Sequence, residues 1–356
     1  MSDTLATSVP QTQKAWLAIR RGEPSYALRL DNNVPVSSKL ENGEVLVKVQ
    51  AAALNPVDHK KLKLLPTVFS GRPHVISHDF AGIVLASSDS KIKQGDEVFG
   101  TILPNFQNRT HQGALSQFAR APTKTVALRP MNITPTQAAG LAVVCLTAYN
   151  ALFDVAKLEP GQSLFVSGGS TAVGIAAIQL AKAIGCKVTA TASGKNEELV
   201  KSLGTDVFID YTKGPVHETL EHNAPTPKFH VILEAAGILA LPLWTHSEAY
   251  LTPGGTFVSV GPQPDGAGEI PILIRYIWEA FIRPTWLGGV KRKWRLCHPQ
   301  EKQEQLEHIA KLISEGKFKS VVDSVYDFDD ALKAFEHVMT KRARGKVIVK
   351  VDPSAD

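Results

Sequence analysis

The sequence predicts an α/β protein with two domains, a small β-rich barrel followed by a doubly wound parallel sheet. Residues 14–130 contain several alternating apolar runs bounded by turn residues, a pattern typical of half-buried strands. From residue 163 onward, apolar runs alternate with helical patterns, as expected for strands and helices that build a parallel sheet. With 356 residues, 44% of them hydrophobic, the chain is long enough for two cores.

Each predicted strand is a short apolar run between turn residues. In the barrel, strands are expected at 45–54, at 80–87 and from residue 96. In the parallel sheet five strands are expected, among them 163–167, 207–210, 230–234 and 256–261. Beyond these we expect a helix near 300–315 that ends at Gly316, a helix after Asp327, and a final strand KVIVKV that returns to the fold.

A helix is predicted to begin after Thr134. The Thr134 hydroxyl suits an N-cap, Pro135 takes the first helical position, and Gln137 stands where a capping box needs it. We expect this helix to run to about Phe153 and to lead into the second domain.

Residues 163–195 have the pattern strand, glycine turn, helix and second strand that binds dinucleotides. Glycines permit the tight turn and the close approach of the helix, which should end at Gly185. Backbone N–H groups at the helix start would face a pyrophosphate, because an anion is favoured there. Thr171 replaces the middle glycine of the usual motif, and glycine turns also occur in α/β proteins that bind no nucleotide. The residues predicted to bind the cofactor here are Gly168, Gly169, Ser170, Thr171, Ala172, Val173 and Gly174.

The loop after the second strand of this unit favours NADPH as the cofactor. It offers Ser193 and Lys195, with no Asp or Glu before Glu197. An acid there would bind the ribose hydroxyl of NAD, whereas a hydroxyl and a lysine suit the extra 2′-phosphate of NADP. The alternative is a solvated lysine with no ligand.

Composition narrows the class of partner and the compartment. The net charge of +5 is mild, and the one dense basic stretch is KRKWR at 291–295, so nucleic acid binding is not indicated. Cys145, Cys186 and Cys297 are far apart and form no CxxC pair, which favours a reducing compartment. The polar start MSDTLATSVPQTQ shows neither a secretory core nor a transit peptide, so we expect a cytoplasmic protein.

Several blocks in order give the chain a resemblance to the medium-chain dehydrogenase/reductase superfamily, in its zinc-independent branch of quinone oxidoreductase-like and enoyl reductase-like proteins. The blocks are AAALNPVDHK, HDFAGIV, QGDEVFG, GALSQFA, LTAYNAL, the dinucleotide unit, LGTDVFIDY, LTPGGTFVSVG and RARGKVIV. The resemblance implies a GroES-like β-barrel domain at 1–132, a Rossmann NADP(H)-binding domain at 133–285, and a C-terminal segment at 286–356 that completes the fold.

The resemblance also bears on metal binding. Zinc enzymes of the superfamily use a Cys, a His with a neighbouring Glu, and a further Cys at positions that correspond here to Asn55, to His78 with Asp79, and to Val143, with Cys145 two residues away. One imidazole without thiolate partners cannot hold tetrahedral zinc, so we predict no metal site. A zinc-free site retains the reduction of activated acceptors such as quinones and α,β-unsaturated carbonyls.

On the barrel side, the resemblance places Asn55 and Asp58 near the nicotinamide, where they could orient a substrate ring or a water. The alternative is that they cap a turn around Pro56. Lys60 could donate a hydrogen bond or a proton to an enolate oxygen, or could be a plain solvated lysine beside Lys61. No side chain is a convincing general acid, so the proton could come from water.

Four further residues are predicted to bind the cofactor. By resemblance, Thr147 touches the nicotinamide carboxamide, Tyr211 lies near the 2′-phosphate adenosine, and Lys346 belongs to a block near the cofactor. Gly261 ends the strand at 256–261. The alternatives are a helix-interior threonine bonded to a carbonyl, a surface tyrosine, and a lysine that closes the fold.

The segment 270–296 is apolar, aromatic and basic. Its charges at Arg275, Glu279 and Arg283 argue against a membrane-spanning helix. It could form a wall for a hydrophobic substrate and a subunit contact in a homodimer, which we favour, or an interfacial helix on a membrane.

Together these features predict an NADPH-dependent, zinc-free oxidoreductase that transfers hydride to a small hydrophobic conjugated acceptor. The alternatives are a trans-acting enoyl reductase of secondary metabolism and a non-catalytic NADPH-binding sensor or scaffold.

Overall fold

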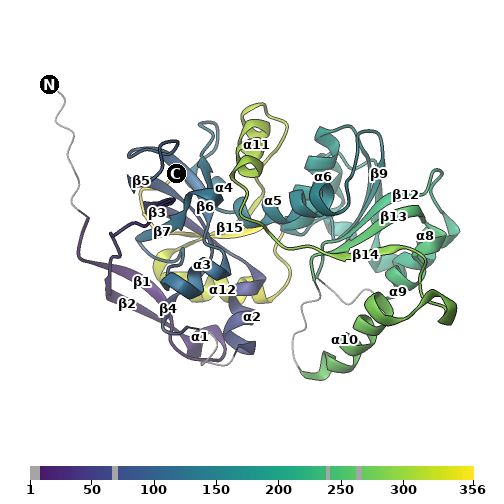
Figure 1. Ribbon diagram of the computed structural model, residues 1–356, viewed down its shortest axis with the longest axis horizontal. Coiled ribbons are helices and arrows are strands. Elements are labelled where there is room, and N and C mark those ends of the chain that lie inside the picture. The colour runs from purple at the N-terminus through teal and green to yellow at the C-terminus, as the bar shows by residue number, and fades with distance from the viewer. Residues whose placement is uncertain (1–8, 66–70, 238–240, 262–266) are drawn as a thin grey trace. The chain divides into compact units, whose positions relative to one another are not determined.

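The computed structural model describes residues 9–65, 71–237, 241–261 and 267–356, and it divides into two compact units (Figure 1). The first unit contains residues 1–143 and 301–356, and the second contains 144–300. The domain boundaries expected from the sequence, after residue 132 and after residue 285, lie earlier in the chain than the boundaries of these two units, after residues 143 and 300. The difference arises because helix α4 (Pro135–Ala139) packs on strands of the first unit, while strand β14 (Lys293–Leu296) joins the sheet of the second.

The first unit is built on a seven-stranded sheet and a three-stranded sheet. The larger has the order β15-β16-β3-β5-β6-β8 with β7 also paired to β3, and the smaller has the order β2-β1-β4. The strands are β1 (Thr12–Ala18), β2 (Leu28–Pro35), β3 (Glu44–Leu54), β4 (His74–Val75), β5 (Asp79–Ser87), β6 (Glu97–Thr101), β7 (Phe118–Pro122), β8 (Val126–Leu128), β15 (Val322–Asp327) and β16 (Lys346–Lys350). The strands expected at 45–54, at 80–87, from 96 and at the C-terminus are thus confirmed.

Helices cover the core of the first unit. Helix α12 turns Ala331, Ala334 and Phe335 inward, where they pack against the apolar residues of β3 and β16. The helices are α1 (Pro24–Ala27), α2 (Pro56–Leu64), α3 (Pro104–Thr110), α4 (Pro135–Ala139), α11 (Gln303–Ser314) and α12 (Ala331–Met339). Helix α11 ends where expected, because Gly316 takes a φ of 69° that suits a left-handed helix end.

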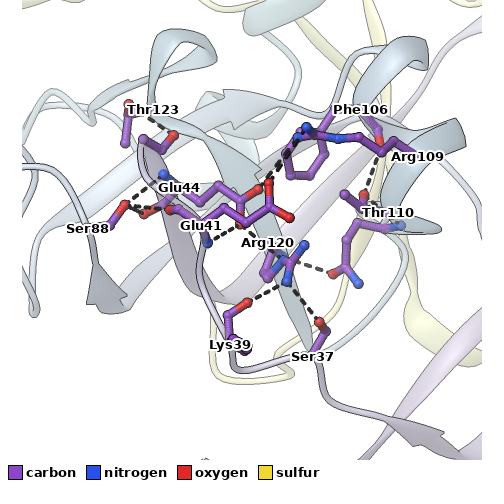
Figure 2. Close-up of polar contacts among 12 residues, drawn as sticks. Ser37, Lys39, Glu41, Glu44, Ser88, Phe106, Arg109, Thr110, Arg120 and Thr123 are labelled. Atoms are coloured by element: carbon purple, nitrogen blue, oxygen red, sulfur yellow. Dashed lines mark hydrogen bonds and ion pairs between the residues drawn. The ribbon is translucent and has the colours of Figure 1, made fainter.

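A buried carboxylate fixes the start of β3. Glu44 is 2% exposed, and its Oε2 lies 3.3 Å from Nε of Arg120 on β7 and accepts the Glu41 N–H at 3.0 Å. Figure 2 shows Arg109 of α3 approaching the same carboxylate, at 3.7 Å. A buried charge is tolerated only with such partners, so Glu44 joins three separate segments of the barrel.

The helix predicted from Thr134 to about Phe153 begins as expected but is not continuous. Thr134 accepts the N–H of Gln137, and the capping box is present. Helix α4 ends at Ala139, and α5 starts at Ala142. The break lies at Gly140, where a Cβ would stand 2.8 Å from the side chain of Lys346. The prediction of a single helix was wrong because this close approach of a distant segment leaves no regular pattern in the local sequence.

The second unit is a six-stranded parallel sheet with the order β11-β10-β9-β12-β13-β14. This is the doubly wound arrangement, in which the order of the strands reverses between β9 and β12, and the predicted fold class is confirmed. The strands are β9 (Ser163–Ser167), β10 (Lys187–Ala192), β11 (Val207–Asp210), β12 (Phe229–Glu234), β13 (Leu251–Ser259) and β14 (Lys293–Leu296). Strand β14 was not foreseen, because its four residues include two cations.

Helices lie on both sides of this sheet. Figure 1 shows α6 on one side and α9 and α10 on the other. The inner residues of α8 and α9 pack with Phe165, Ile232 and Phe257 of the strands, whereas α6 contacts β9 and β10. The helices are α5 (Ala142–Tyr149), α6 (Ala172–Ala183), α7 (Glu197–Ser202), α8 (Val216–His222), α9 (Leu241–Thr245) and α10 (Ile270–Ile277).

Short helical segments complete both units. In the described ranges two of these segments are π-helical, Asn150–Val155 and Trp278–Ile282. The others are 3₁₀ turns at Thr123–Thr125, Gly194–Asn196, Tyr211–Lys213, Ser247–Ala249, Ala267–Glu269, Thr285–Leu287 and Phe328–Asp330.

The segment 270–296 presents a large apolar surface. Trp286 is 84% exposed, and eight further apolar side chains between 270 and 287 are exposed. They are Ile270, Ile272, Ile274, Ile277, Trp278, Phe281, Ile282 and Leu287. In the part of the chain that the structure describes, no helix has the length and apolar character needed to cross a membrane.

Candidate active site

The glycine turn of the second unit lies at the carboxyl end of β9. Gly168 has a φ of 88°, and its N–H donates to Oγ1 of Thr191 at the end of β10. A Cβ on Gly174 would stand 2.1 Å from the carbonyl oxygen of Gly168. Helix α6 therefore approaches the turn so closely that only glycine, which has no Cβ, fits at position 174.

The start of α6 fits a pyrophosphate. Thr171 caps the helix by accepting the N–H of Gly174 at 3.1 Å, and it donates to the carbonyl of Gly168 at 2.8 Å. The N–H groups of Ala172 and Val173 belong to the first turn of this 12-residue helix, which has no preceding helical carbonyl to bind them. Threonine in place of the motif's middle glycine thus serves as the N-cap. The residues predicted to cradle a dinucleotide lie together at this helix start and fit that ligand.

The loop after β10 is held beside the glycine turn. Asn196 donates from Nδ2 to Oγ of Ser170 at 3.1 Å. Ser193 is half-buried and Lys195 is exposed in this loop. Both residues belong to the loop that Asn196 ties to Ser170, and they remain candidates for binding a 2′-phosphate.

Sequence reasoning missed one acid at this place. Asp210, at the end of the neighbouring strand β11, accepts from the hydroxyl and the backbone N–H of Thr212 and from the Gly194 N–H, and these bonds lower the pKa of Asp210. The signal was visible in the block IDY, since adjacent parallel strands end at the same edge of a sheet. The loop therefore carries a carboxylate as well as the ammonium of Lys195.

Three other predicted cofactor residues are dispersed over the second unit. Tyr211 is 53% exposed after β11, and Thr147 is buried within α5. Gly261 follows β13, with a φ of 96° and its N–H bonded to Oγ of Ser259 at 3.1 Å. Their contacts with a cofactor stay predictions.

In the first unit, Asn55 lies in a buried cluster with Asp79 and Lys346. Lys346 donates from Nζ to Asn55 Oδ1 at 2.6 Å and to Asp79 Oδ2 at 3.0 Å, and Asn55 Nδ2 donates to the same Asp79 oxygen at 2.9 Å. The other oxygen of Asp79 accepts the N–H of Val143 at 3.0 Å. Lys346 thus has two hydrogen-bond acceptors in this unit, Asn55 and Asp79. Its role toward the cofactor stays a prediction.

Asp58 combines a capping role with a bond to an imidazole. Its Oδ2 accepts the N–H of Asn55 at 2.7 Å, which caps α2, and its Oδ1 lies 2.6 Å from Nδ1 of His78. The capping alternative is therefore realised, while the second oxygen orients a histidine whose Nε2 is buried and has no hydrogen-bond partner among the residues that the structure describes. Lys60, on the same helix, is half-buried.

A small cavity lies beside this pair, lined by Asp58, Lys61, Leu62, Leu65, Arg72, His74, Ile76, His78 and Gln107. Burial lowers the pKa of Lys61, although Asp58 opposes the shift. Burial, assisted by the charge of Lys61, also lowers the pKa of His74 to about 4. His74 is therefore neutral at physiological pH, so the cavity is lined by uncharged imidazole as well as by charged groups.

The positions that hold zinc in related enzymes do not fit a metal here. The carbonyl oxygen of the Asn55 side chain already faces a buried ammonium, His78 Nδ1 faces Asp58, and Val143 has no donor side chain. Within the described ranges, no three His, Cys, Asp or Glu side chains are grouped so that they could hold a metal ion. A second cation beside Lys346 would also meet electrostatic repulsion.

Two family models match the chain. The alcohol dehydrogenase GroES-like domain matches residues 41–131, and the domain described as zinc-binding dehydrogenase matches residues 203–349. The first lies within the barrel, and the second covers strands of the parallel sheet and the C-terminal return.

Whole-chain comparisons give the same result. Trans-enoyl reductase pgmF of Aspergillus terreus is 33% identical over 98% of this chain and 99% of its own length. The NADPH-dependent alkenal/one oxidoreductase of Arabidopsis thaliana, a chloroplastic protein, is 32% identical over 97% of this chain and 81% of its own. The quinone oxidoreductase of Coxiella burnetii, a solved structure, is 26% identical with a TM-score of 0.75 and covers 95% of this chain and 99% of its own. These similarities extend over both units, and the chain therefore belongs to the medium-chain dehydrogenase/reductase superfamily, whose oxidoreductases use a nicotinamide cofactor.

Proposed function

We propose that the protein is an NADPH-dependent reductase that transfers hydride to a small hydrophobic conjugated acceptor, either a quinone or an α,β-unsaturated carbonyl, without zinc. The observation that carries the proposal is the Asn55–Asp79–Lys346 cluster, in which an ammonium faces residues at positions where related enzymes bind the metal. Without a Lewis acid to polarise an alcohol, reduction of an acceptor that is already activated is the feasible direction.

NADPH is proposed over NADH because of Lys195. Its ammonium is exposed in the loop after β10, beside the glycine turn. A relative named as NADPH-dependent supports this choice. The carboxylate of Asp210 at the same edge opposes a phosphate, so the preference depends on Lys195 and Ser193.

The chain's own residues bind and orient the reactants. A bound nicotinamide would supply the hydride, and the turn at 168–174 would hold its pyrophosphate. Asn55 and Asp58 are fixed by buried hydrogen bonds, so they could orient a substrate with little loss of side-chain entropy. Lys60 remains the candidate donor toward a developing enolate oxygen, and water the alternative source of the proton.

The test is oxidation of NADPH, followed by absorbance, against a panel of quinones, enones and short 2-enoyl thioesters. NADH serves as the control cofactor, and a chelator is present throughout. Turnover with NADPH that survives chelation is expected. Tight NADPH binding without turnover on any acceptor would instead identify a non-catalytic sensor or scaffold.

A carrier-bound 2-enoyl thioester is the second candidate acceptor. The relative named as a trans-enoyl reductase, similar over nearly the full length of both chains, favours it. A preference for thioesters over quinones in the same panel would select this function.

We also propose that the protein is cytoplasmic and that the exposed apolar surface of 270–296 forms a substrate wall and a contact between two copies of the chain. The absence of a cysteine pair suits a reducing compartment. Deletion of 276–296 should change both the kinetics and the mass in solution. Unchanged kinetics and unchanged mass would contradict this assignment.

A further inference from the structure

Helix α10 has one buried residue, the aromatic side chain of Tyr276. Tyr276 is 1% exposed, whereas most of the helix faces solvent. Its hydroxyl accepts the indole N–H of Trp294 on β14 at 3.2 Å and is hydrogen-bonded to Ser259 at the end of β13. Burial raises the pKa of Tyr276, so the phenol keeps its proton and can donate it.

The hydrogen bonds continue from Ser259 to a buried acid. Ser259 donates from Oγ to Oε2 of Glu234 at 3.2 Å, and Glu234, at the end of β12, is fully buried. An indole can only donate, and Ser259 gives its single proton to Glu234, so the Tyr276 hydroxyl is the donor toward Ser259. The chain of donors runs from Trp294 through Tyr276 and Ser259 to Glu234.

The same series of hydrogen bonds also holds the backbone just beyond strands β12 and β13. The second oxygen of Glu234 accepts the N–H of Ala236 at 2.9 Å, and Ser259 Oγ accepts the N–H of Gly261 at 3.1 Å. Ser259 then uses its whole bonding capacity, accepting from Tyr276 and Gly261 and donating to Glu234. Loss of the Tyr276 hydroxyl would leave the indole N–H of Trp294 without its acceptor and remove one donor from Ser259.

The two fixed segments lie at the ligand-binding edge of the sheet. Ligands of doubly wound sheets bind outside the carboxyl ends of the strands, where Ala236 and Gly261 stand. Ala236 is also packed on the glycine turn, since a Cβ on Gly168 would stand 3.0 Å from it. Thr171, the cap of α6, shares its single hydroxyl proton between the carbonyl oxygens of Gly168 at 2.8 Å and Ala235 at 3.1 Å.

We propose that Tyr276 is a positioning residue for the cofactor: from helix α10 it holds, through Ser259 and Glu234, the backbone at Ala236 and Gly261 against the dinucleotide turn. The inference rests on the proposed use of a nicotinamide cofactor and extends it to a residue of helix α10. The segment 270–296 then has a buried function in addition to its exposed surface.

The test compares Tyr276→Phe with Tyr250→Phe. Tyr250 is also fully buried in the same core, and its hydroxyl donates to the carbonyl of Leu243 at 2.6 Å, away from this chain of bonds. Both variants remove one buried hydroxyl and should lower stability alike. Tyr276→Phe alone should speed hydrogen–deuterium exchange of the Ala236 and Gly261 amides about tenfold in cofactor-free protein, and raise the dissociation constant of the cofactor by about the same factor.

A second pair of variants tests the route. Ser259→Ala should reproduce both effects, and the double variant should be little worse than Ser259→Ala, because the two residues act in series. If Tyr276→Phe fails to fold, Trp294→Phe removes only the first donor and should show the same pattern more weakly. Equal exchange and equal affinity in Tyr276→Phe and Tyr250→Phe would overturn the proposal.

The exchange measurement separates this inference from the proposed function. Affinity is measured for whichever nicotinamide cofactor the wild type binds, so a preference for NADH would contradict the choice of NADPH and leave this comparison intact. Exchange is measured without cofactor, and unchanged exchange at Ala236 and Gly261 in Tyr276→Phe overturns the positioning role even in an active reductase.

Discussion

The ammonium of Lys346 lies 3.0 Å from Oδ2 of Asp79, and both side chains are almost completely buried. Asp79 begins β5 and Lys346 begins β16, so the pair joins segments separated by 267 residues. Every oxygen of this carboxylate has a partner, since Asn55 and the backbone of Val143 complete its bonds. A buried ion pair adds little folding stability compared with a pair of apolar side chains, but removal of one partner leaves an uncompensated buried charge.

Lys346→Met should therefore destabilise the first unit by about 3–5 kcal/mol, because it leaves Asp79 charged and buried. Denaturant unfolding would measure the change. Lys350→Met is the control on the same strand, where the ion pair with Asp356 is more exposed and should contribute at most about 1 kcal/mol. Equal, small losses in both variants would show that water reaches Asp79.

Lys195→Ala should weaken NADPH binding but leave NADH binding almost unchanged. The variant removes a charge-assisted contact to the 2′-phosphate, a loss of about 1–3 kcal/mol in binding free energy. Dissociation constants for both cofactors give the measurement. Asp210→Asn, which removes the opposing charge, should shift the preference further toward NADPH. Equal losses for NADPH and NADH in Lys195→Ala would refute the assignment.

Gly174→Ala should abolish dinucleotide binding, because its Cβ would stand 2.1 Å from the Gly168 carbonyl oxygen and push α6 from the turn. Cofactor titration and thermal unfolding would both register the change. Gly268→Ala is the matched control, since a Cβ there meets no atom within 4 Å. Cofactor affinity retained in Gly174→Ala would mean that the turn does not hold the pyrophosphate.

The low pKa of His74 makes stability depend on pH. Its folded pKa of about 4 lies below the ordinary histidine value of 6.5, mainly through burial and then through the charges of Lys61 and Arg72. The unfolded chain thus binds more protons between these values, so this contribution is complete above pH 6.5 and is lost as the pH falls toward 4. The loss is at most about 3 kcal/mol. Unfolding free energies measured across this range should fall more steeply in the wild type than in His74→Gln, and parallel curves would contradict the shift.

Short sequence motifs correctly predicted the helix starts and turns that depend only on residues close together in the sequence. Thr134 and Gln137 form the capping box, and the turn from Gly168 to Gly174 starts the helix that the motif indicated. Contacts between distant segments could not be predicted in this way. Gly140 interrupts a helix because the stem of Lys346 approaches it, although nothing within ten residues of Gly140 indicates this.

In the candidate site, too, local motifs were predictable from the sequence and contacts between distant segments were not. The residues of the glycine turn were predictable because one continuous stretch contains them all. Asp210 was missed because it comes from the neighbouring strand, and the partnership of Lys346 with Asn55 depends on a pairing between β16 and β3 that only the folded sheet provides.

The position of β16 has a consequence for the order in which the protein folds during synthesis. This strand follows the whole second unit in the sequence, lies between β15 and β3, and carries the lysine that neutralises Asp79. A nascent chain therefore exposes the apolar edge of β3 and an uncompensated acid until β16 has been synthesised. The second unit is continuous from 144 to 300, so its whole sheet is available earlier. Although the barrel is translated first, it must complete its folding last.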